Sequence, residues 1–274
     1  MNLIHTLEEA GNAAARANPA AEGDYIGENG LLYCGLCHTP KQWRGELPGL
    51  GEVIQAASCK CQSEKLRQEQ EQRTRQKLRD MAFDTAAMQK WDFAHDDGKN
   101  PDLTAAMRKY AALFASQSTE EVPGLLLHGG VGGGKTYAAA EVVNALVDMG
   151  FSCRMTSFAR IAGDLQNLRD RNTYIQDLNR CRLLVLDDLG AERDTAYMGE
   201  IVFQVIDTRI RTGLPLIVTT NLTIEEIKKP ATLGNSRICD RLIEKCHPIE
   251  VSGVSRRRKE AAARYPEMRE VLGM

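Results

Sequence analysis

The stretch that decides the fold runs from Gly124 to Thr136 and reads GLLLHGGVGGGKT. Its second part, residues 129–136, fits the pattern G-x-x-x-x-G-K-[ST], with the fixed glycines at Gly129 and Gly134. Glycines allow successive backbone N–H groups to point inward at phosphate oxygens, and the positive end of a following helix adds to the attraction. The stretch therefore predicts a strand, a phosphate-binding loop and the start of a helix.

The loop motif predicts the roles of its last two residues. Lys135 is expected to reach the β- and γ-phosphates of a nucleotide, and the Thr136 hydroxyl to ligate Mg²⁺. The alternative is a glycine-rich turn that precedes Lys-Thr by coincidence, but the apolar run before it and YAAAEVVNALVDM after it favour a nucleotide site. The predicted ATP-binding residues are Gly129, Gly130, Val131, Gly132, Gly133, Gly134, Lys135, Thr136, Tyr137 and Asp187.

Short apolar runs alternate with helical runs on both sides of the loop. The candidate strands are residues 124–128, 152–156, 182–187, 214–219 and 247–251. Between the third and the fourth, apolar residues from 198 to 206 repeat at helical spacing. Strands separated by helices of this length predict a parallel α/β sheet.

Two acids end the third candidate strand, in LLVLDDLG. Asp187 is the expected Mg²⁺-site acid and Asp188 the expected catalytic base. Adjacent residues of a strand point to opposite faces, so both acids serve one site only if the strand ends there, as Leu189-Gly190 suggests. The alternative is a solvent-exposed strand end.

Polar residues after the fourth strand complete the pattern. Asn221 follows LPLIVTT, and an amide there can bind the γ-phosphate or the attacking water, although a turn asparagine is the simpler alternative. Arg237 and Arg241 are one helical turn apart and suit phosphate recognition; the alternative is a surface helix with ion pairs to Asp240 and Glu244.

GGVGGGKT, LLVLDDLGAE, VTTN and SRICDRL, in this order, resemble the AAA+ P-loop ATPases of the DnaC-like helicase-loader group, with the IstB transposition helpers as close relatives. The resemblance spans about residues 85–255 and implies a five-stranded parallel sheet of order 5-1-4-3-2. It implies that one subunit's arginine reaches its neighbour's nucleotide, and it matches Asn221 to sensor I, Arg237 and Arg241 to the arginine-finger region, and Arg256 to a late sensor arginine. The expected catalytic residues are Lys135, Asp188, Asn221, Arg237 and Arg241.

The acidic motif departs from the group. Many AAA+ proteins have Asp-Glu where this chain has Asp187-Asp188. Because aspartate is one methylene shorter, we expect slow ATP hydrolysis, stimulated by assembly or single-stranded DNA and acting more as a switch than as a motor.

Eight cysteines form two groups. Cys34, Cys37, Cys59 and Cys61 make a C-x₂-C knuckle and a C-x-C pair, whereas the other four are scattered and are expected to be buried thiols. Two short pairs of thiolates suit tetrahedral Zn²⁺, and a small domain needs such a metal to fold. His38 is an alternative ligand, and a redox pair or plain thiols are alternative interpretations.

The cysteine group resembles the small N-terminal zinc domain of some bacterial and phage helicase loaders, which grips the helicase. We therefore expect three parts: a zinc-binding, helicase-docking domain at 1–62, a basic helical linker at 63–84 and the AAA+ ATPase domain at 85–274. From Lys60 to Asp80 there are seven basic and four acidic side chains, which suits either a solvated helix or a nucleic-acid contact.

The segment FARIAGDLQNLRDRNTYIQDLN resembles the helical insertion that lines the central channel in this group. Its arginines and aromatic rings suit single-stranded DNA, which is bound by a basic groove with stacking platforms. The alternative is a helix pair with Phe158, Ile161, Leu165 and Leu168 as core. The candidate DNA contacts are Arg160, Arg169, Arg171, Phe158 and Tyr174.

Charge and hydropathy exclude two classes. The 35 basic and 37 acidic side chains give a net charge of −2, which rules out a histone-like polybasic protein. No apolar run of transmembrane length and no secretory signal is evident, so a cytoplasmic protein without a membrane partner is expected.

Three functions follow from these features. The first is a loader that binds a replicative helicase of the DnaB-type hexamer through the zinc domain, forms homo-oligomers and holds single-stranded DNA. The second is an IstB-like transposition helper, and the third is a nucleotide-switched adaptor with negligible turnover. The cysteine cluster favours the loader, because it looks like a dedicated docking module.

Overall fold

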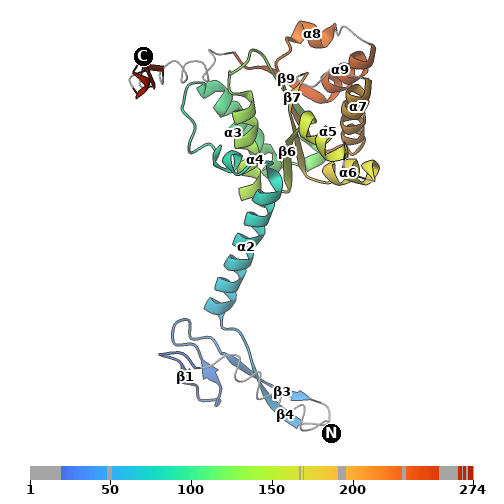
Figure 1. Ribbon diagram of the computed structural model, residues 1–274. Helices are drawn as coiled ribbons and strands as arrows, with labels where there is room; N and C mark the ends of the chain where they lie inside the picture. The colour runs from blue at the N-terminus through green and yellow to red at the C-terminus, as the bar shows by residue number, and fades with distance from the viewer. Residues whose placement is uncertain are drawn as a thin grey trace. The chain divides into compact units, whose positions relative to one another are not determined.

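The computed structural model describes residues 20–47, 51–166, 168, 170–190, 196–229, 233–252, 265–266, 268–269 and 271–273. The chain forms two compact units, Met1–Thr74 and Arg75–Met274 (Figure 1). Within the described ranges, no helix has the length and apolar character needed to cross a membrane.

The first unit is built from small antiparallel pairs. Strand β1 (Tyr25–Ile26) pairs with β2 (Leu32–Tyr33), and β3 (Gln42–Leu47) pairs with β4 (Gly51–Ala56). Helix α2 (Lys60–Ala82) begins in this unit and covers most of the predicted helical linker. Among the described residues up to Thr74, the buried ones are Leu31, Cys34, Lys41 and Cys59. Apolar burial in this unit is therefore minimal.

The second unit contains a five-stranded parallel sheet. Its strands are β5 (Gly124–His128), β6 (Cys153–Ser157), β7 (Leu183–Leu189), β8 (Leu216–Thr220) and β9 (Cys246–Glu250). Their order is β6-β7-β8-β5-β9, with every neighbouring pair parallel. Read from the other edge, this is the predicted order 5-1-4-3-2, so the predicted α/β fold is confirmed.

Helices cover both faces of this sheet (Figure 1). On one face, α3 (Pro101–Ser116) and α4 (Lys135–Asp148) pack on strand residues such as Leu125 and Val185. The alternate residues of the same strands, such as Leu126 and Leu186, pack against α5 (Phe158–Gln166), α6 (Arg171–Leu178), α7 (Ala196–Arg211) and α9 (Leu233–Lys245). The period of two along each strand thus builds two cores, one on each face. The remaining elements are the short helices η1 (Ala86–Lys90), η2 (Thr119–Glu121) and α8 (Ile224–Lys228).

A buried arginine joins the loops that precede two central strands. Arg209 is fully buried and donates five hydrogen bonds, of 2.7 to 3.1 Å, to the carbonyls of Asn179, Cys181, Arg182 and Pro215. The guanidinium therefore links the carbonyls on both loops and holds the starts of β7 and β8 in place. Asp187 and Asp188 lie near the end of β7, and Asn221 directly follows β8.

Candidate functional site

The phosphate-binding loop is held by glycines and by the end of the last strand. Gly129 and Gly134 have φ angles of 129° and 99°, which residues with a Cβ rarely adopt. A Cβ at Gly129 would lie 2.7 Å from the carbonyl oxygen of Val251, whose own N–H donates to His128 O at 2.8 Å. The first glycine is thus required both by its backbone conformation and by the close approach of the chain after β9.

Lys135, the first residue of α4, folds its side chain back onto the loop. The side chain is 5% exposed, and its Nζ donates to Gly129 O, Gly130 O and Asn221 Oδ1, each at 2.8 Å. The predicted sensor asparagine, from the end of β8, therefore contacts the P-loop lysine directly. This contact joins two positions 86 residues apart in the sequence.

The two acids of β7 differ in their surroundings. Asp187 is buried, accepts a hydrogen bond of 2.6 Å from Thr219 Oγ1 and has a hydrogen bond with Thr136; burial raises its pKa above the usual value. Asp188 is exposed and has a left-handed φ of 58°. The strand ends at Leu189, directly after these acids, as Leu189-Gly190 indicated. A register shift between Leu186 and Leu189 also reorients the acids.

A cleft of about 440 Å³ lies beside the loop. Its walls include Lys135, Thr136, Asp188 and Asn221, so the structure brings these four predicted residues to one place. The hydroxyl of Thr136 and the carboxylate of Asp187 supply oxygen donors of the kind that Mg²⁺ prefers. The cleft, with Thr136 on its wall and Asp187 hydrogen-bonded to Thr136, fits a nucleotide with its metal ion.

The segment before α3 forms the other wall of this cleft, which the sequence analysis did not foresee. Trp91, His95 and Asp97 line it together with the P-loop. The Trp91 ring stacks on Tyr137 with centroids 5.8 Å apart, and Asn144 Nδ2 donates to Trp91 O at 2.9 Å. The signal available in the sequence was WDFAHDD, residues 91–97, a cluster of aromatic and acidic residues for which no role was predicted.

The two predicted arginines of α9 have different environments, and neither lines the cleft described above. Arg241 pairs with Asp207 Oδ1 at 2.7 Å and lies over the Phe203 ring, so its partner is on α7 and not on its own helix. Arg237 is exposed, and within the described ranges it makes no hydrogen bond or ion pair. Arg256 lies outside the described residues.

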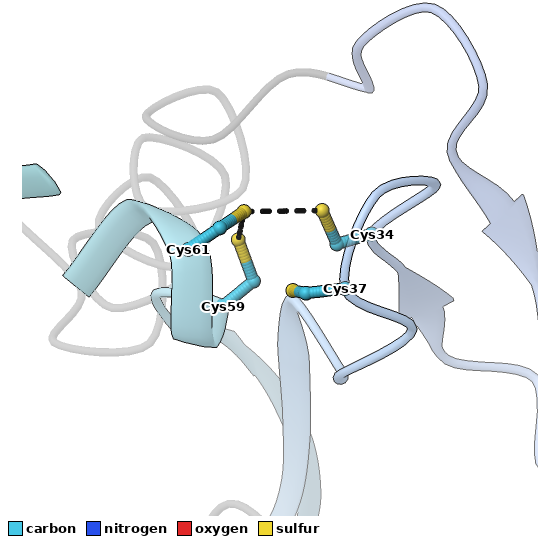
Figure 2. Close-up of side chains that lie close together, drawn as sticks. All are labelled: Cys34, Cys37, Cys59 and Cys61. Atoms are coloured by element: carbon cyan, nitrogen blue, oxygen red, sulfur yellow. Dashed lines mark hydrogen bonds between the residues drawn. The ribbon is translucent and has the colours of Figure 1, made fainter. Parts of the chain in front are cut away.

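The four N-terminal cysteines converge, as Figure 2 shows. Their sulfurs all lie within 4.8 Å of one another, with Cys34 to Cys61 at 3.6 Å and Cys59 to Cys61 at 3.4 Å. Hydrogen bonding from Thr39 lowers the pKa of Cys37 to about 5, which favours a thiolate. The donor set fits Zn²⁺, which prefers four sulfur or nitrogen ligands in a tetrahedron.

The neighbours of this cluster hold the knuckle in shape. Asp24 accepts from the backbone N–H of Gly35 at 3.0 Å and pairs with the buried Lys41 at 2.5 Å. The ring of His38, the alternative ligand, instead meets the hydroxyl of Tyr25 at 3.4 Å. Nothing in the spacing of Asp24 and Lys41 marks them as partners, so the sequence did not predict this pair.

Those of the predicted DNA-contacting residues that the structure describes lie on α5 and α6. Phe158 is 1% exposed, which confirms the interpretation of this residue as core and excludes its ring from stacking on bases. Leu168, expected in that core, is 42% exposed. Tyr174 is half-buried and bonds Asp164, which also pairs with Arg160. Arg171 lies over Tyr197, and Arg169 is outside the described residues.

Known proteins resemble this chain in sequence and fold. Residues 54–263 match the family model of the IstB-like ATP binding protein. Rv3427c of Mycobacterium tuberculosis, described as an ATP-binding protein in an insertion sequence, is 31% identical over 195 residues, which cover 69% of this chain and 75% of Rv3427c.

The replicative helicase loader DnaI of Bacillus subtilis is 26% identical over 179 residues, covering 60% of this chain and 58% of the loader. The match thus spans less than two thirds of the loader's length. A crystal structure of DnaI shares the fold with a TM-score of 0.56 at 23% identity, over 65% of this chain and 98% of that one. The chain belongs to the family of IstB-like ATP binding proteins, within the same AAA+ group as the helicase loaders.

Proposed function

We propose that this chain is an ATPase that loads a replicative helicase onto single-stranded DNA. The observation that carries the proposal is the cleft in which Lys135, Asn221 and Asp188 meet, in a chain whose other unit holds a four-sulfur cluster. The cleft supplies nucleotide chemistry, and the separate unit supplies a surface for a partner.

The residues of the cleft have complementary roles in hydrolysis. Lys135 places a positive charge against the β- and γ-phosphate oxygens. Because Asn221 Oδ1 accepts from Lys135, its amide nitrogen is the group that donates to the γ-phosphate or to the attacking water. Asp188, on the cleft wall, accepts a hydrogen bond from that water and orients it.

Mg²⁺ bound with the nucleotide would neutralise the negative charge that develops on the phosphates. Thr136 and Asp187 are the residues that would hold it. The short Asp188 side chain favours slow turnover, in keeping with a switch that releases its partner after hydrolysis.

Subunit assembly completes the site in this proposal. Arg241 and Arg237 lie on α9, away from the cleft of their own subunit, and a guanidinium suits the charge on a neighbour's γ-phosphate. The pairing of Arg241 with Asp207 fixes the direction of its side chain on α9 before assembly.

The zinc unit is the proposed helicase-docking part. At the tip of the C-x₂-C knuckle, Leu36 is 85% exposed, and Ile26, Trp43 and Ile54 also present apolar surface on this small unit. Exposed apolar side chains of this kind suit a protein interaction surface.

Single-stranded DNA is assigned to α6 and the start of α7. The guanidinium of Arg171 lies 5.4 Å from the ring centroid of Tyr197, and this ring is 38% exposed. A cation beside an accessible ring suits a phosphate and a stacked base together. Tyr197→Ala should lower the affinity for an oligonucleotide, and Tyr265→Ala, another exposed tyrosine, should not.

The ATPase part of the proposal is tested with Lys135→Ala. This variant should lose hydrolysis and bind ATP weakly, because the phosphates lose their main side-chain partner. Lys109→Ala, an exposed lysine on α3, is the matched control and should keep wild-type turnover. Equal turnover in both variants, with contaminating ATPases excluded, would contradict the assignment.

The loader part is tested with the purified replicative helicase of the same organism. The full chain should bind the hexamer and load it onto circular single-stranded DNA, and Leu36→Asp should abolish binding while nucleotide affinity is kept. The second candidate function, an IstB-like transposition helper, is favoured by the match to Rv3427c. Binding to a transposase, with no binding to the helicase, would decide for that candidate.

A further inference from the structure

The two acids of the nucleotide site lie opposite one residue of the neighbouring strand. In the pairing of β7 with β8, Leu186 is opposite Val218 and Leu189 is opposite Thr220. Asp187 and Asp188 therefore share Thr219 as their single counterpart. This two-to-one pairing is a β-bulge, a feature that redirects side chains next to functional sites.

The hydroxyl of Thr219 bonds both acids. Its Oγ1 donates to Asp187 Oδ1 at 2.6 Å and accepts from the backbone N–H of Asp188 at 3.0 Å. The residue is fully buried, so water does not replace either bond. We propose that Thr219 is a positioning residue of the nucleotide site, which orients the Asp187 carboxylate and holds the bulge that turns Asp188 into the cleft. This inference rests on the roles proposed above for the two acids.

The backbone conformation explains why the bulge needs support. Asp188 has a φ of 58°, which is unfavourable for a residue with a Cβ, even though aspartate tolerates it better than most. Without the bulge, strict alternation along β7 would send Asp187 and Asp188 to opposite faces of the sheet. Only one of the acids would then face the P-loop.

Thr220 anchors the far side of the same bulge. Its Oγ1 donates to Leu189 O at 2.7 Å and accepts from the N–H of Leu222 at 3.2 Å. These bonds involve backbone groups and neither acid. Of these two threonines, Thr219 therefore has the direct link to a carboxylate. Removing its hydroxyl should weaken Mg²⁺ binding at Asp187.

The test replaces Thr219 in the full chain. Thr219→Val keeps the shape and removes the hydroxyl, whereas Thr219→Ser keeps the hydroxyl. Thr156→Val is the matched control, because Thr156 is a buried threonine of β6 whose hydroxyl donates to a carboxylate, Asp84 at 2.7 Å, outside the cleft. Thr219→Ala replaces the valine variant if that one precipitates.

Two readouts are measured: ADP affinity by calorimetry with and without Mg²⁺, and steady-state hydrolysis of ATP. Thr219→Val should bind metal-free ADP as the wild type does, lose about tenfold or more of the affinity gained from Mg²⁺, and lose kcat by a similar factor with little change in KM. Thr219→Ser should restore both values, and Thr156→Val should leave both unchanged.

The inference is overturned if Thr219→Val keeps both the gain in ADP affinity from Mg²⁺ and kcat within twofold of wild type. It is also overturned if Thr219→Ser shows the same losses in both values as Thr219→Val. ATP hydrolysis that survives in the Lys135→Ala variant, with Thr219 unchanged, would contradict the proposed function instead. The two failures are therefore distinguishable.

Discussion

Removal of zinc is the perturbation with the largest expected effect. In the described part of the first unit, Leu31 is the buried aliphatic side chain, and its burial contributes roughly 1.5–3 kcal/mol. Ordering the backbone costs roughly 1–2 kcal/mol for every residue. A structural Zn²⁺ site contributes roughly 10–16 kcal/mol. Since a folded domain is stable by only about 5–15 kcal/mol, loss of the metal should unfold this unit.

The assay combines elemental analysis with hydrogen exchange on the full chain. Protein purified without added metal should contain one Zn²⁺ per chain. A strong zinc chelator should abolish amide protection in residues 20–59 and leave protection of the parallel sheet unchanged. Cys59→Ser should behave like the chelated protein, whereas Cys181→Ser, the same substitution outside the cluster, should keep both zinc and protection.

Two results would refute this reasoning. One is a chain that is free of zinc as purified and yet shows protected amides in the first unit. The other is Cys59→Ser with full zinc content and full protection, which would remove Cys59 from the ligand set.

Three further predictions concern the second unit. Arg209→Met should lower Tm by roughly 10 °C, because four backbone carbonyls lose their buried donor; a shift below about 2 °C would contradict this role. Trp91 fluorescence should change when ADP binds, once the other tryptophan, Trp43 on β3, is replaced by phenylalanine; an unchanged spectrum at saturation would place the ligand elsewhere. Arg241→Ala should bind ATP and fail to hydrolyse it, and mixing it with Lys135→Ala should restore part of the activity. If mixtures that co-assemble on single-stranded DNA stay inactive, Arg237 becomes the candidate.

Local patterns predicted the fold well because they reflect local physics. The five candidate strands match β5 to β9 within two residues at each end. Strand, glycine loop and helix follow one another in the chain, so the P-loop needed no knowledge of distant contacts. The cysteine pairs are likewise local, and only their meeting within 4.8 Å required the tertiary structure.

Aromatic side chains show what the sequence alone left open. Phe158 and Tyr197 are both aromatic residues near helix starts, yet the first is 1% and the second 38% exposed. Which ring faces solvent depends on how α5 and α7 pack on the sheet. Periodicity described the apolar face of α5 as core, and the helix packing confirms that interpretation for Phe158.

The sequence by itself determined the chemistry of the nucleotide site: the glycines, the lysine, the acids and the asparagine follow strands in the order that a parallel sheet brings to one edge. The tertiary structure alone decided how these groups are aimed. The bulge opposite Thr219, the pairing of Arg241 with Asp207 and the place of Trp91 on the cleft wall depend on contacts between segments far apart in the chain. Strand register and helix packing select such contacts, and neither is encoded in the spacing of neighbouring residues.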